Sequence, residues 1–281
     1  MRGRWRKGKP VTASHAFATR YGAWAIVAGA SEGVGRELAR RVASNGVGCI
    51  LLARRKGPLE ELEGLIREES GVQCVSAAVD LAGPDALDRI LAVVGDKEVG
   101  LYVSNAGADP FASAFLDREV GDWLGLVQRN VLTTVRCCHH FGRLMRQRRR
   151  GGLLLVGSGA AIGGAERMAT YAGTKAFELR FAESLWAELR HFEVDVLCLG
   201  LATTDTPELR RLLAQTGQPV PRRMASPARI ADIALARLPR GPVYGWGPLA
   251  GMRAAWVRER VKLFTSLSSN VLGRGTHVLG R

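Results

Sequence analysis

The sequence predicts a single α/β domain whose parallel sheet is covered by helices on both faces. Six nearly continuous apolar runs alternate with amphipathic segments along 281 residues. Continuous apolar runs are typical of strands that are buried on both faces of a parallel sheet. A chain of this length can bury one large core, and no linker or internal repeat divides it. We therefore expect one doubly wound domain with about seven strands.

The elements follow from this alternation in chain order. The apolar runs place strands at 23–28, 47–53, 72–79, 100–104, 153–158 and 194–200, and a seventh near 242–245. The amphipathic segments between them predict helices at 33–44, 58–69, 84–94, 117–149 and 168–191. The sequence after the seventh strand matches no element of this architecture.

A glycine-rich turn joins the first expected strand to the first expected helix. Gly29 permits a tight turn, Gly33 lets the backbone approach a pyrophosphate, and Gly35 lets the helix pack closely on the strand. The free N–H groups of the helix N-terminus favour an anion at this point. Strand, glycine turn and helix in this order predict a dinucleotide site at Gly29, Ser31, Glu32, Gly33, Val34 and Gly35.

Tyr171 and Lys175 lie four residues apart in a predicted helix, so their side chains share one helix face. A lysine cation beside a tyrosine favours the ionised phenolate, which makes Tyr171 a candidate general acid/base near neutral pH. The pair alone is a weak signal, and its context decides its meaning.

Polar and glycine residues follow three of the expected strands. Asn105 closes the fourth strand, Ser158 ends the fifth, and Gly200 ends the sixth. Ligands of a doubly wound sheet bind outside the carboxyl ends of its strands. These independent motifs therefore converge on one crevice.

The segment from about residue 21 to about residue 207 resembles the short-chain dehydrogenase/reductase family. The resemblance rests on five motifs in order: Gly29-x-x-x-Gly33-x-Gly35, Val79-Asp80-Leu81, Asn105-Ala106-Gly107, Asn130, and Ser158 thirteen residues before Tyr171-x-x-x-Lys175. It implies a single-domain Rossmann fold and a nicotinamide cofactor. It also implies an oxidoreductase that interconverts a ketone or aldehyde and an alcohol.

The resemblance implies a role for each matching residue. Tyr171 would exchange a proton with the substrate oxygen, and Ser158 would hydrogen-bond that oxygen. Lys175 would lower the pKa of the Tyr171 phenol and hold the nicotinamide ribose. Asn130 would anchor a water that links the lysine to solvent. Asp80 would contact the adenine. The further implied cofactor contacts are Leu81, Asn105, Ala106, Gly107, Tyr171, Lys175, Ala202 and Thr204.

One departure concerns the turn after the sixth strand. The family usually has Pro-Gly there, whereas this chain has Leu199-Gly200. Leucine restores an N–H donor and frees the backbone angle that proline fixes. We expect the change to reshape the rim of the site without abolishing activity.

The end of the second strand indicates the choice of cofactor. An acidic residue there would hold the ribose 2′-hydroxyl of NAD, but the chain has Arg54 and Arg55. An arginine can instead bind a 2′-phosphate through charge-assisted hydrogen bonds. We therefore expect NADP(H), with Arg54 as the primary ligand and Arg55 as the secondary one; the acidic Glu32 in the glycine turn counts against this choice.

The sequence does not select one substrate. The segment 203–225 lies where the family places a mobile lid, and its residues Leu209, Leu212 and Leu213 indicate an apolar lining. An apolar ketone, a steroid-like alcohol and a fatty acyl derivative all fit. Loops on this fold vary while the chemistry stays the same.

A net charge of +14 raises two alternatives. Such a surface attracts nucleic acid or anionic lipid, but no nucleic-acid motif accompanies it. The chain could also be an NADP(H)-binding scaffold without turnover. The complete set of Asn130, Ser158, Tyr171 and Lys175 speaks against a scaffold, which needs no activated tyrosine.

Composition also bounds the compartment and the domain limits. Five cysteines without paired spacing indicate a reducing cytoplasm with no metal site and no disulfide framework, and no apolar segment reaches the roughly 20 residues of a membrane span. We expect a basic extension at 1–20, a catalytic domain at 21–247, and a basic helical tail at 248–281. The tail could lie on a membrane surface or against a partner subunit. The resemblance implies a homodimer or homotetramer formed through 117–149 and 168–191.

Overall fold

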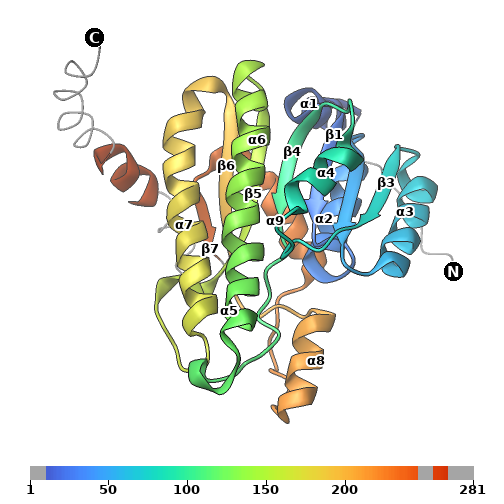
Figure 1. Ribbon diagram of the computed structural model, residues 1–281. Coiled ribbons are helices and arrows are strands. Elements are labelled where there is room, and N and C mark those ends of the chain that lie inside the picture. Colours follow the sequence, from blue (N-terminus) through green and yellow to red (C-terminus); the bar gives the residue numbers. More distant parts are fainter. Residues whose placement is uncertain (1–10, 246–255, 265–281) are drawn as a thin grey trace, which may run out of the picture.

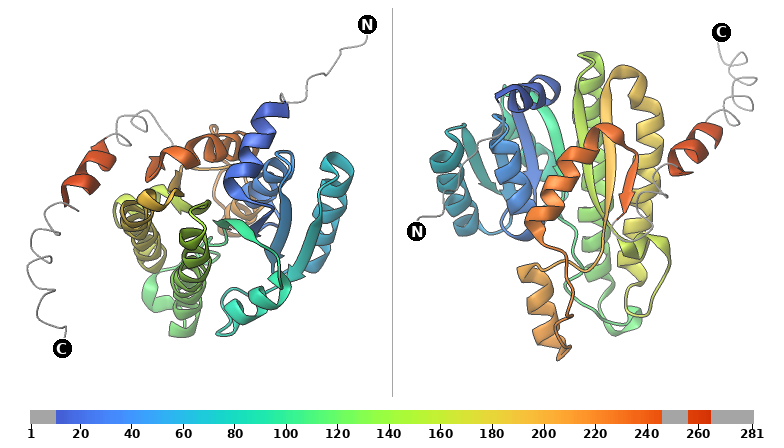
Figure 2. Two further views of the ribbon diagram at one scale, coloured as in Figure 1. Left: turned by 90° about the horizontal axis from the view of Figure 1, so that it is seen from above. Right: turned by 180° about the vertical axis from the view of Figure 1, so that it is seen from behind.

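The computed structural model describes residues 11–245 and 256–264. Its centre is one sheet of seven parallel strands in the order β3-β2-β1-β4-β5-β6-β7. Helices lie on both faces of the sheet (Figures 1 and 2). This confirms the expected doubly wound architecture. The strands are β1 Trp24–Ala28, β2 Gly48–Ala53, β3 Cys74–Ala78, β4 Val99–Ser104, β5 Gly151–Ser158, β6 Val194–Leu201 and β7 Val243–Gly245.

The helices alternate with the strands, as the amphipathic segments predict. They are α1 Val11–Tyr21, α2 Gly33–Ala43, α3 Lys56–Ser70, α4 Ala86–Val94, α5 Val120–Val127, α6 Thr133–Gln147, α7 Ala169–Leu189, α8 Pro207–Thr216 and α9 Pro227–Arg237. Helix α8 projects from one end of the domain within the predicted lid segment (Figure 1).

The helix expected over 117–149 is present as one helical run over 120–147, but its type changes within it. A five-residue π-helix, Gln128–Leu132, separates α5 from α6. A π-turn adds one residue to the helical repeat, occurs mostly inside α-helices and is frequent at functional sites. Asn130 lies in its middle with no exposed surface. The π-turn lies within an otherwise continuous helical run, so the amphipathic pattern did not mark the change of helix type.

The two faces of the sheet have separate apolar cores. On β1, Ala25 and Val27 belong to the core shared with α2, α3 and α9, whereas Ile26 and Ala28 belong to the core shared with α4, α6 and α7. Adjacent residues of one strand point to opposite faces. This arrangement accounts for the continuous apolar runs in the sequence.

Helix α1 is tied to the far half of the sheet by the half-buried carboxylate of Asp195. Arg20 donates two hydrogen bonds to Asp195 of β6, with Nε to Oδ2 at 2.6 Å and Nη2 to Oδ1 at 2.7 Å. The Tyr21 hydroxyl donates to the same carboxylate at 2.8 Å and is 1% exposed. Burial, then the negative charge of Asp195, raises the pKa of Tyr21 well above its ordinary value. The predicted extension 1–20 thus contains a helix that packs on the domain.

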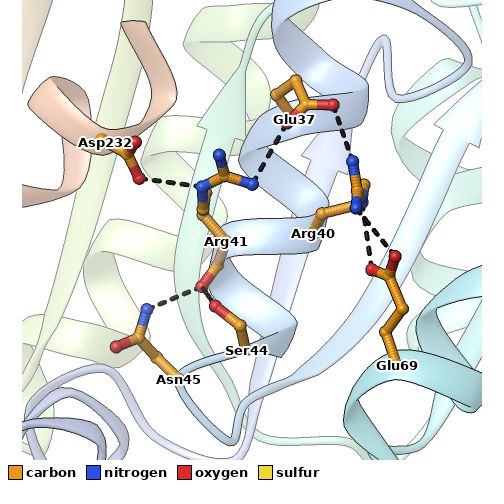
Figure 3. Close-up of polar contacts among 7 residues, drawn as sticks. All are labelled: Glu37, Arg40, Arg41, Ser44, Asn45, Glu69 and Asp232. Atoms are coloured by element: carbon orange, nitrogen blue, oxygen red, sulfur yellow. Dashed lines mark hydrogen bonds and ion pairs between the residues drawn. The ribbon is translucent and has the colours of Figure 1, made fainter. Parts of the chain in front are cut away.

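Ion pairs fasten α2 to its neighbours on the surface (Figure 3). Arg41 donates to Asp232 of α9 at 2.8 Å, and Arg40 donates to Glu69 of α3 at 2.8 and 3.1 Å. Glu37 accepts a hydrogen bond from each arginine. Single exposed pairs contribute little, but this network holds the helix that follows the glycine turn.

The ends of the chain are described in part. Residues 1–10 of the predicted basic extension, and 246–255 and 265–281 around and within the predicted tail, lie outside the described residues. Residues 256–264 are helical, and Arg260 donates to Glu183 of α7 at 2.6 Å. No helix in the described ranges is long and apolar enough to cross a membrane.

Candidate active site

The glycine turn adopts a backbone that only glycine tolerates. Gly29 has φ +81°, and a Cβ atom on it would lie 2.7 Å from the backbone nitrogen of Ala106. A Cβ atom on Gly35 would lie 2.0 Å from the carbonyl oxygen of Gly29. Both approaches are too close for any side chain, so the turn, the start of α2 and the end of β4 are in direct backbone contact.

The N-terminus of α2 has no side-chain cap from the residue before it, Glu32. The first N–H groups of a helix have no partner within it and favour an anion. Asn105 Nδ2 donates to the Gly29 carbonyl at 2.9 Å and so holds the turn against β4. The N–H groups of Gly29 and Ala30 both donate to the Leu52 carbonyl, at 2.7 and 3.1 Å, so the groups that suit a dinucleotide pyrophosphate are those of the first turn of α2.

The other predicted cofactor-binding residues near the turn differ in how exposed their side chains are. Val34 is buried in the core, so only its backbone faces the site, and Ser31 is half-buried. Asp80 is exposed and accepts a hydrogen bond from the backbone nitrogen of Ala82 at 3.0 Å, which is the local capping that a structural role requires. Leu81 is buried, and its carbonyl accepts from Thr133 at 2.8 Å.

The two arginines after β2 have different surroundings. Arg55 donates to the Glu32 carboxylate at 2.5 Å, whereas Arg54 is exposed and makes no ion pair with any described residue. Arg211 of α8 also binds Glu32 and reaches Glu208 at 2.6 Å. Burial opposes ionisation of Glu32, but the hydrogen bonds from Arg211 and Arg55 outweigh it and lower the pKa of Glu32. One carboxylate therefore joins the glycine turn, the end of β2 and the lid helix.

Lys175 is buried at the end of β5, with 3% of its surface exposed. Its Nζ donates to the Val156 carbonyl at 3.0 Å and to Glu178 Oε2 at 2.9 Å. The same nitrogen lies 5.9 Å from the centre of the Tyr171 ring, which places both groups on one face of α7, as their spacing predicts. Burial lowers the pKa of Lys175, but the charges of Glu178 and Tyr171 outweigh it and raise that pKa.

Asn130 lies beside the lysine. Its Nδ2 donates to Thr174 Oγ1 at 3.0 Å and to the Gly107 carbonyl at 3.4 Å. A Cβ atom on Gly107 would lie 2.8 Å from Lys175 Nζ and 3.1 Å from Asn130 Oδ1. The π-turn, the end of β4 and α7 therefore bring these three predicted residues together.

Ser158 and Tyr171 are both half-buried. Ser158 is the last residue of β5, and its hydroxyl accepts a hydrogen bond from the Ala160 nitrogen at 3.2 Å. Its side chain thus caps the following turn and has lone-pair and donor capacity left for a ligand.

The last predicted cofactor contacts lie in the segment after β6. Leu199 pairs with Val156 and Tyr244 within the sheet, so β6 continues to Leu201 where the family usually has proline. Thr204 is buried, and its hydroxyl donates to the Ala202 carbonyl at 2.8 Å, while Ala202 is exposed.

Sequence reasoning missed three polar residues at this site. Glu178 contacts Lys175, and Thr174 links Asn130 to the Tyr171 carbonyl at 2.8 Å. Arg129 is half-buried and donates to the Ala108 carbonyl at 2.8 Å. An acidic residue three positions after a helical lysine was the available signal for Glu178.

Comparison with known proteins places this geometry in a family. The sequence pattern of the short chain dehydrogenase family matches residues 23–216. A 7beta-hydroxysteroid dehydrogenase of Collinsella aerofaciens is 29% identical over 221 residues, which cover 78% of this chain and 84% of that protein. A very-long-chain 3-oxoacyl-CoA reductase of Laccaria bicolor is 33% identical over 66% of this chain and 56% of its own length.

Solved structures show the same architecture. A structure described for 7beta-hydroxysteroid dehydrogenase stereoselectivity matches with a TM-score of 0.73 at 27% identity, over 82% of this chain and 90% of that one. A short-chain dehydrogenase from Sphingobium yanoikuyae in complex with NADPH matches with a TM-score of 0.74, over 92% and 96% of the two chains. At 23% identity it supports the fold alone.

Proposed function

Because this chain belongs to the short chain dehydrogenase family of oxidoreductases that act on CH–OH and C=O groups, we propose that it interconverts an apolar ketone or aldehyde and its alcohol with NADP(H). The observation that carries the proposal is the arrangement of Lys175 on one helix face with Tyr171, with Asn130 and Gly107 beside it and the glycine turn packed against the end of β4. A structural role alone would not gather these groups from α7, the π-turn and the end of β4.

The cofactor would be held along the carboxyl ends of β1, β2 and β4. Backbone N–H groups of the turn at Gly33 to Gly35 bind its pyrophosphate, Asp80 contacts the adenine, and Lys175 holds the nicotinamide ribose. When bound, NADPH supplies the hydride that reduces the carbonyl carbon.

The protein's own residues handle the substrate oxygen. Tyr171 donates a proton to that oxygen during reduction and takes it back during oxidation. Ser158 hydrogen-bonds the same oxygen and stabilises the negative charge that develops on it. Lys175 keeps a positive charge beside the phenol, and Asn130 holds the water through which the lysine exchanges protons with solvent.

NADP(H) is favoured over NAD(H) by Arg54, which is exposed and forms no ion pair within the described ranges, so that its guanidinium can bind a 2′-phosphate. Arg55 is partly neutralised by Glu32, so it is the weaker ligand. This difference supports the order in which the sequence ranks the two arginines.

An apolar substrate is supported by the lid and by the named relatives. Leu209, Leu212 and Leu213 of α8 are half-buried. The relatives cited above carry the names of a hydroxysteroid dehydrogenase and a very-long-chain 3-oxoacyl-CoA reductase, and both names describe large apolar substrates. The shared chemistry is a carbonyl carried on an extended apolar body.

The proposed enzyme works in the cytoplasm as a homo-oligomer. Five free, buried thiols suit a reducing compartment. Apolar side chains remain exposed along α5, the π-turn and α7, among them Leu124 at 60%, Leu132 at 44% and Phe177 at 38%. A second copy packed on these helices would cover them.

Titration of the purified protein with NADPH and NADH, followed by nicotinamide fluorescence, tests the cofactor site. We expect NADPH to bind more tightly, and Arg54→Asp to remove most of that preference. Arg240→Asp is the matched control, because Arg240 is also exposed but lies after α9, and it should leave both affinities unchanged. Absence of binding by either nucleotide contradicts the proposal.

Tyr171→Phe then separates binding from chemistry. It should retain NADPH affinity and lose turnover of a panel of steroid, aromatic and 3-oxoacyl ketones by about a hundredfold or more. Retained turnover would remove Tyr171 from its role.

A further inference from the structure

The ammonium of Lys175 has a single carboxylate in contact with it. Glu178 Oε2 lies 2.9 Å from Nζ, and the side chains are 1% and 3% exposed. The two residues are three positions apart on α7, so the helix itself sets their separation. No other ion pair involves Lys175 in the described part of the chain.

The groups that face this pair from other elements carry no compensating charge. Cys198 of β6 and Cys138 of α6 are buried thiols; burial raises the pKa of Cys198 to about 12 and that of Cys138 well above its ordinary value. Both thiols are therefore neutral in the working range of an enzyme. From α7 itself, Tyr171 faces the ammonium, and the Val156 carbonyl of β5 accepts one of its hydrogen bonds.

A buried ammonium without a counter-ion tends to lose its proton, because burial disfavours the charged form. Burial does lower the pKa of Lys175, but Glu178 and then Tyr171 raise it above its ordinary value. Burial also raises the pKa of the Glu178 carboxyl, against the attraction of Lys175. The pair thus keeps its charges over a range bounded below by Glu178 and above by Lys175.

We propose that Glu178 is a positioning residue for the reaction, which keeps the Lys175 ammonium charged and fixed at the end of β5 where it faces Tyr171 and the cofactor ribose. The inference rests on the proposed function. The buried Glu178 carboxylate then has a role in the active site as well as any contribution to the stability of α7. Two of the three ammonium donors are used by Val156 and Glu178, which leaves one for a ligand.

The pH dependence of NADPH affinity tests this role without any substrate. Wild type, Glu178→Gln and Glu183→Gln are titrated with NADPH over about pH 7–12, a range that includes the ordinary lysine pKa of about 10.4. NADPH affinity should fall as the pH rises, and the midpoint of this fall should lie at least about one pH unit lower in Glu178→Gln than in wild type. At the alkaline end of the range, Glu178→Gln should therefore bind NADPH about tenfold more weakly than wild type does. The pH profile of kcat with a ketone that the wild type reduces should shift in the same direction.

Glu183 provides the matched control. It is a second buried glutamate on α7, with 6% of its surface exposed, and it accepts hydrogen bonds from Arg180 and Arg260. It makes no hydrogen bond to Lys175, so Glu183→Gln should keep the wild-type pH midpoint even where it lowers stability. A Glu178→Gln profile that overlays the wild-type profile overturns the proposal.

Two further variants keep the test decisive. Glu178→Asp retains the charge and should restore the wild-type midpoint, and a midpoint as low as that of Glu178→Gln would contradict the charge argument. Thermal unfolding of Lys175→Met, Glu178→Gln and the double variant measures the pair without cofactor; purely additive shifts would show that the pair is uncoupled and would overturn the proposal. Failure of the wild type to bind NADPH at any pH would instead refute the proposed function.

Discussion

Gly35→Ala is the sharpest test of the glycine turn as a dinucleotide site. The added Cβ atom would lie 2.0 Å from the Gly29 carbonyl oxygen and 2.5 Å from Asn105 Nδ2, whereas ordinary contacts are at 3.4 Å or more. The obstructing atoms belong to the backbone and to a hydrogen-bonded amide, so α2 must move away from the turn. Overpacking of this kind costs about 1–3 kcal/mol, which for a domain of this size lowers the melting temperature by roughly 2–12 °C.

The same displacement moves the N–H groups that would bind a pyrophosphate. We expect NADPH affinity to fall at least about tenfold, equivalent to about 1.4 kcal/mol. Thermal unfolding and NADPH fluorescence titration measure the two effects separately.

Gly64→Ala is the control for a glycine without a close approach. Gly64 lies inside α3, and a Cβ atom on it would meet nothing within 4 Å. The substitution should stabilise the protein by about 0.5–1 kcal/mol, because alanine favours a helix interior, and should leave NADPH affinity unchanged. A Gly35→Ala protein with wild-type melting temperature and wild-type affinity would refute the close packing of α2 on the turn.

The remaining predictions concern two carboxylates. Glu32→Gln should release Arg55 from its ion pair and raise the ratio of NADPH to NADH affinity by about threefold to tenfold, as measured by paired titrations. The pKa of Glu32 is lowered in the folded protein, so its ion pair with Arg211 should be fully formed above the ordinary carboxyl pKa of 4.5. The ion pair should be lost as the pH falls through the lower pKa of the folded state. Cleavage of the lid segment by an acid-active protease should then become faster. Asp195→Asn should lower the free energy of unfolding by about 1–2 kcal/mol, a value reduced for the 47% exposure of Arg20, as measured by urea denaturation.

For each of these three predictions, one result would contradict it. An unchanged affinity ratio would show that Glu32 does not restrain Arg55, and cleavage at the lid that ignores pH would remove Glu32 as its anchor. Asp232→Asn is the matched control for Asp195, because its pair with Arg41 lies on the surface and should contribute less. An equal loss in both variants would contradict a special role for the α1 contact.

The sheet could be predicted from sequence because its inner strands, among them β1, β2 and β4, are buried on both faces. The apolar runs at β1 and β2 have no polar residue to interrupt them, and β7 appears where a seventh strand was expected. Tyr171 and Lys175 could be placed together because their spacing puts them on one helix face, whereas Asn130 was assigned to the site through the family resemblance.

The rest depends on contacts between distant segments or on helix details that periodicity does not carry. The π-turn around Asn130 changes the hydrogen bonding inside an otherwise continuous helical run, and the amphipathic pattern does not mark that change. The link from Glu32 to Arg211 joins residues that are 179 positions apart. In a chain with so many arginines, charge alone does not identify which partner a carboxylate selects.

The contact between Arg20 and Asp195 spans 175 positions, so it constrains the order of events in folding. During synthesis, α1 emerges first but cannot reach its carboxylate until β6 has been made. The half of the sheet that contains β1 to β4 can assemble before then, because all four strands and their pairings lie ahead of β6 in the chain. Docking of α1 on β6 therefore closes the domain late, and a polypeptide that stops before residue 195 would leave the buried face of Tyr21 without its partner.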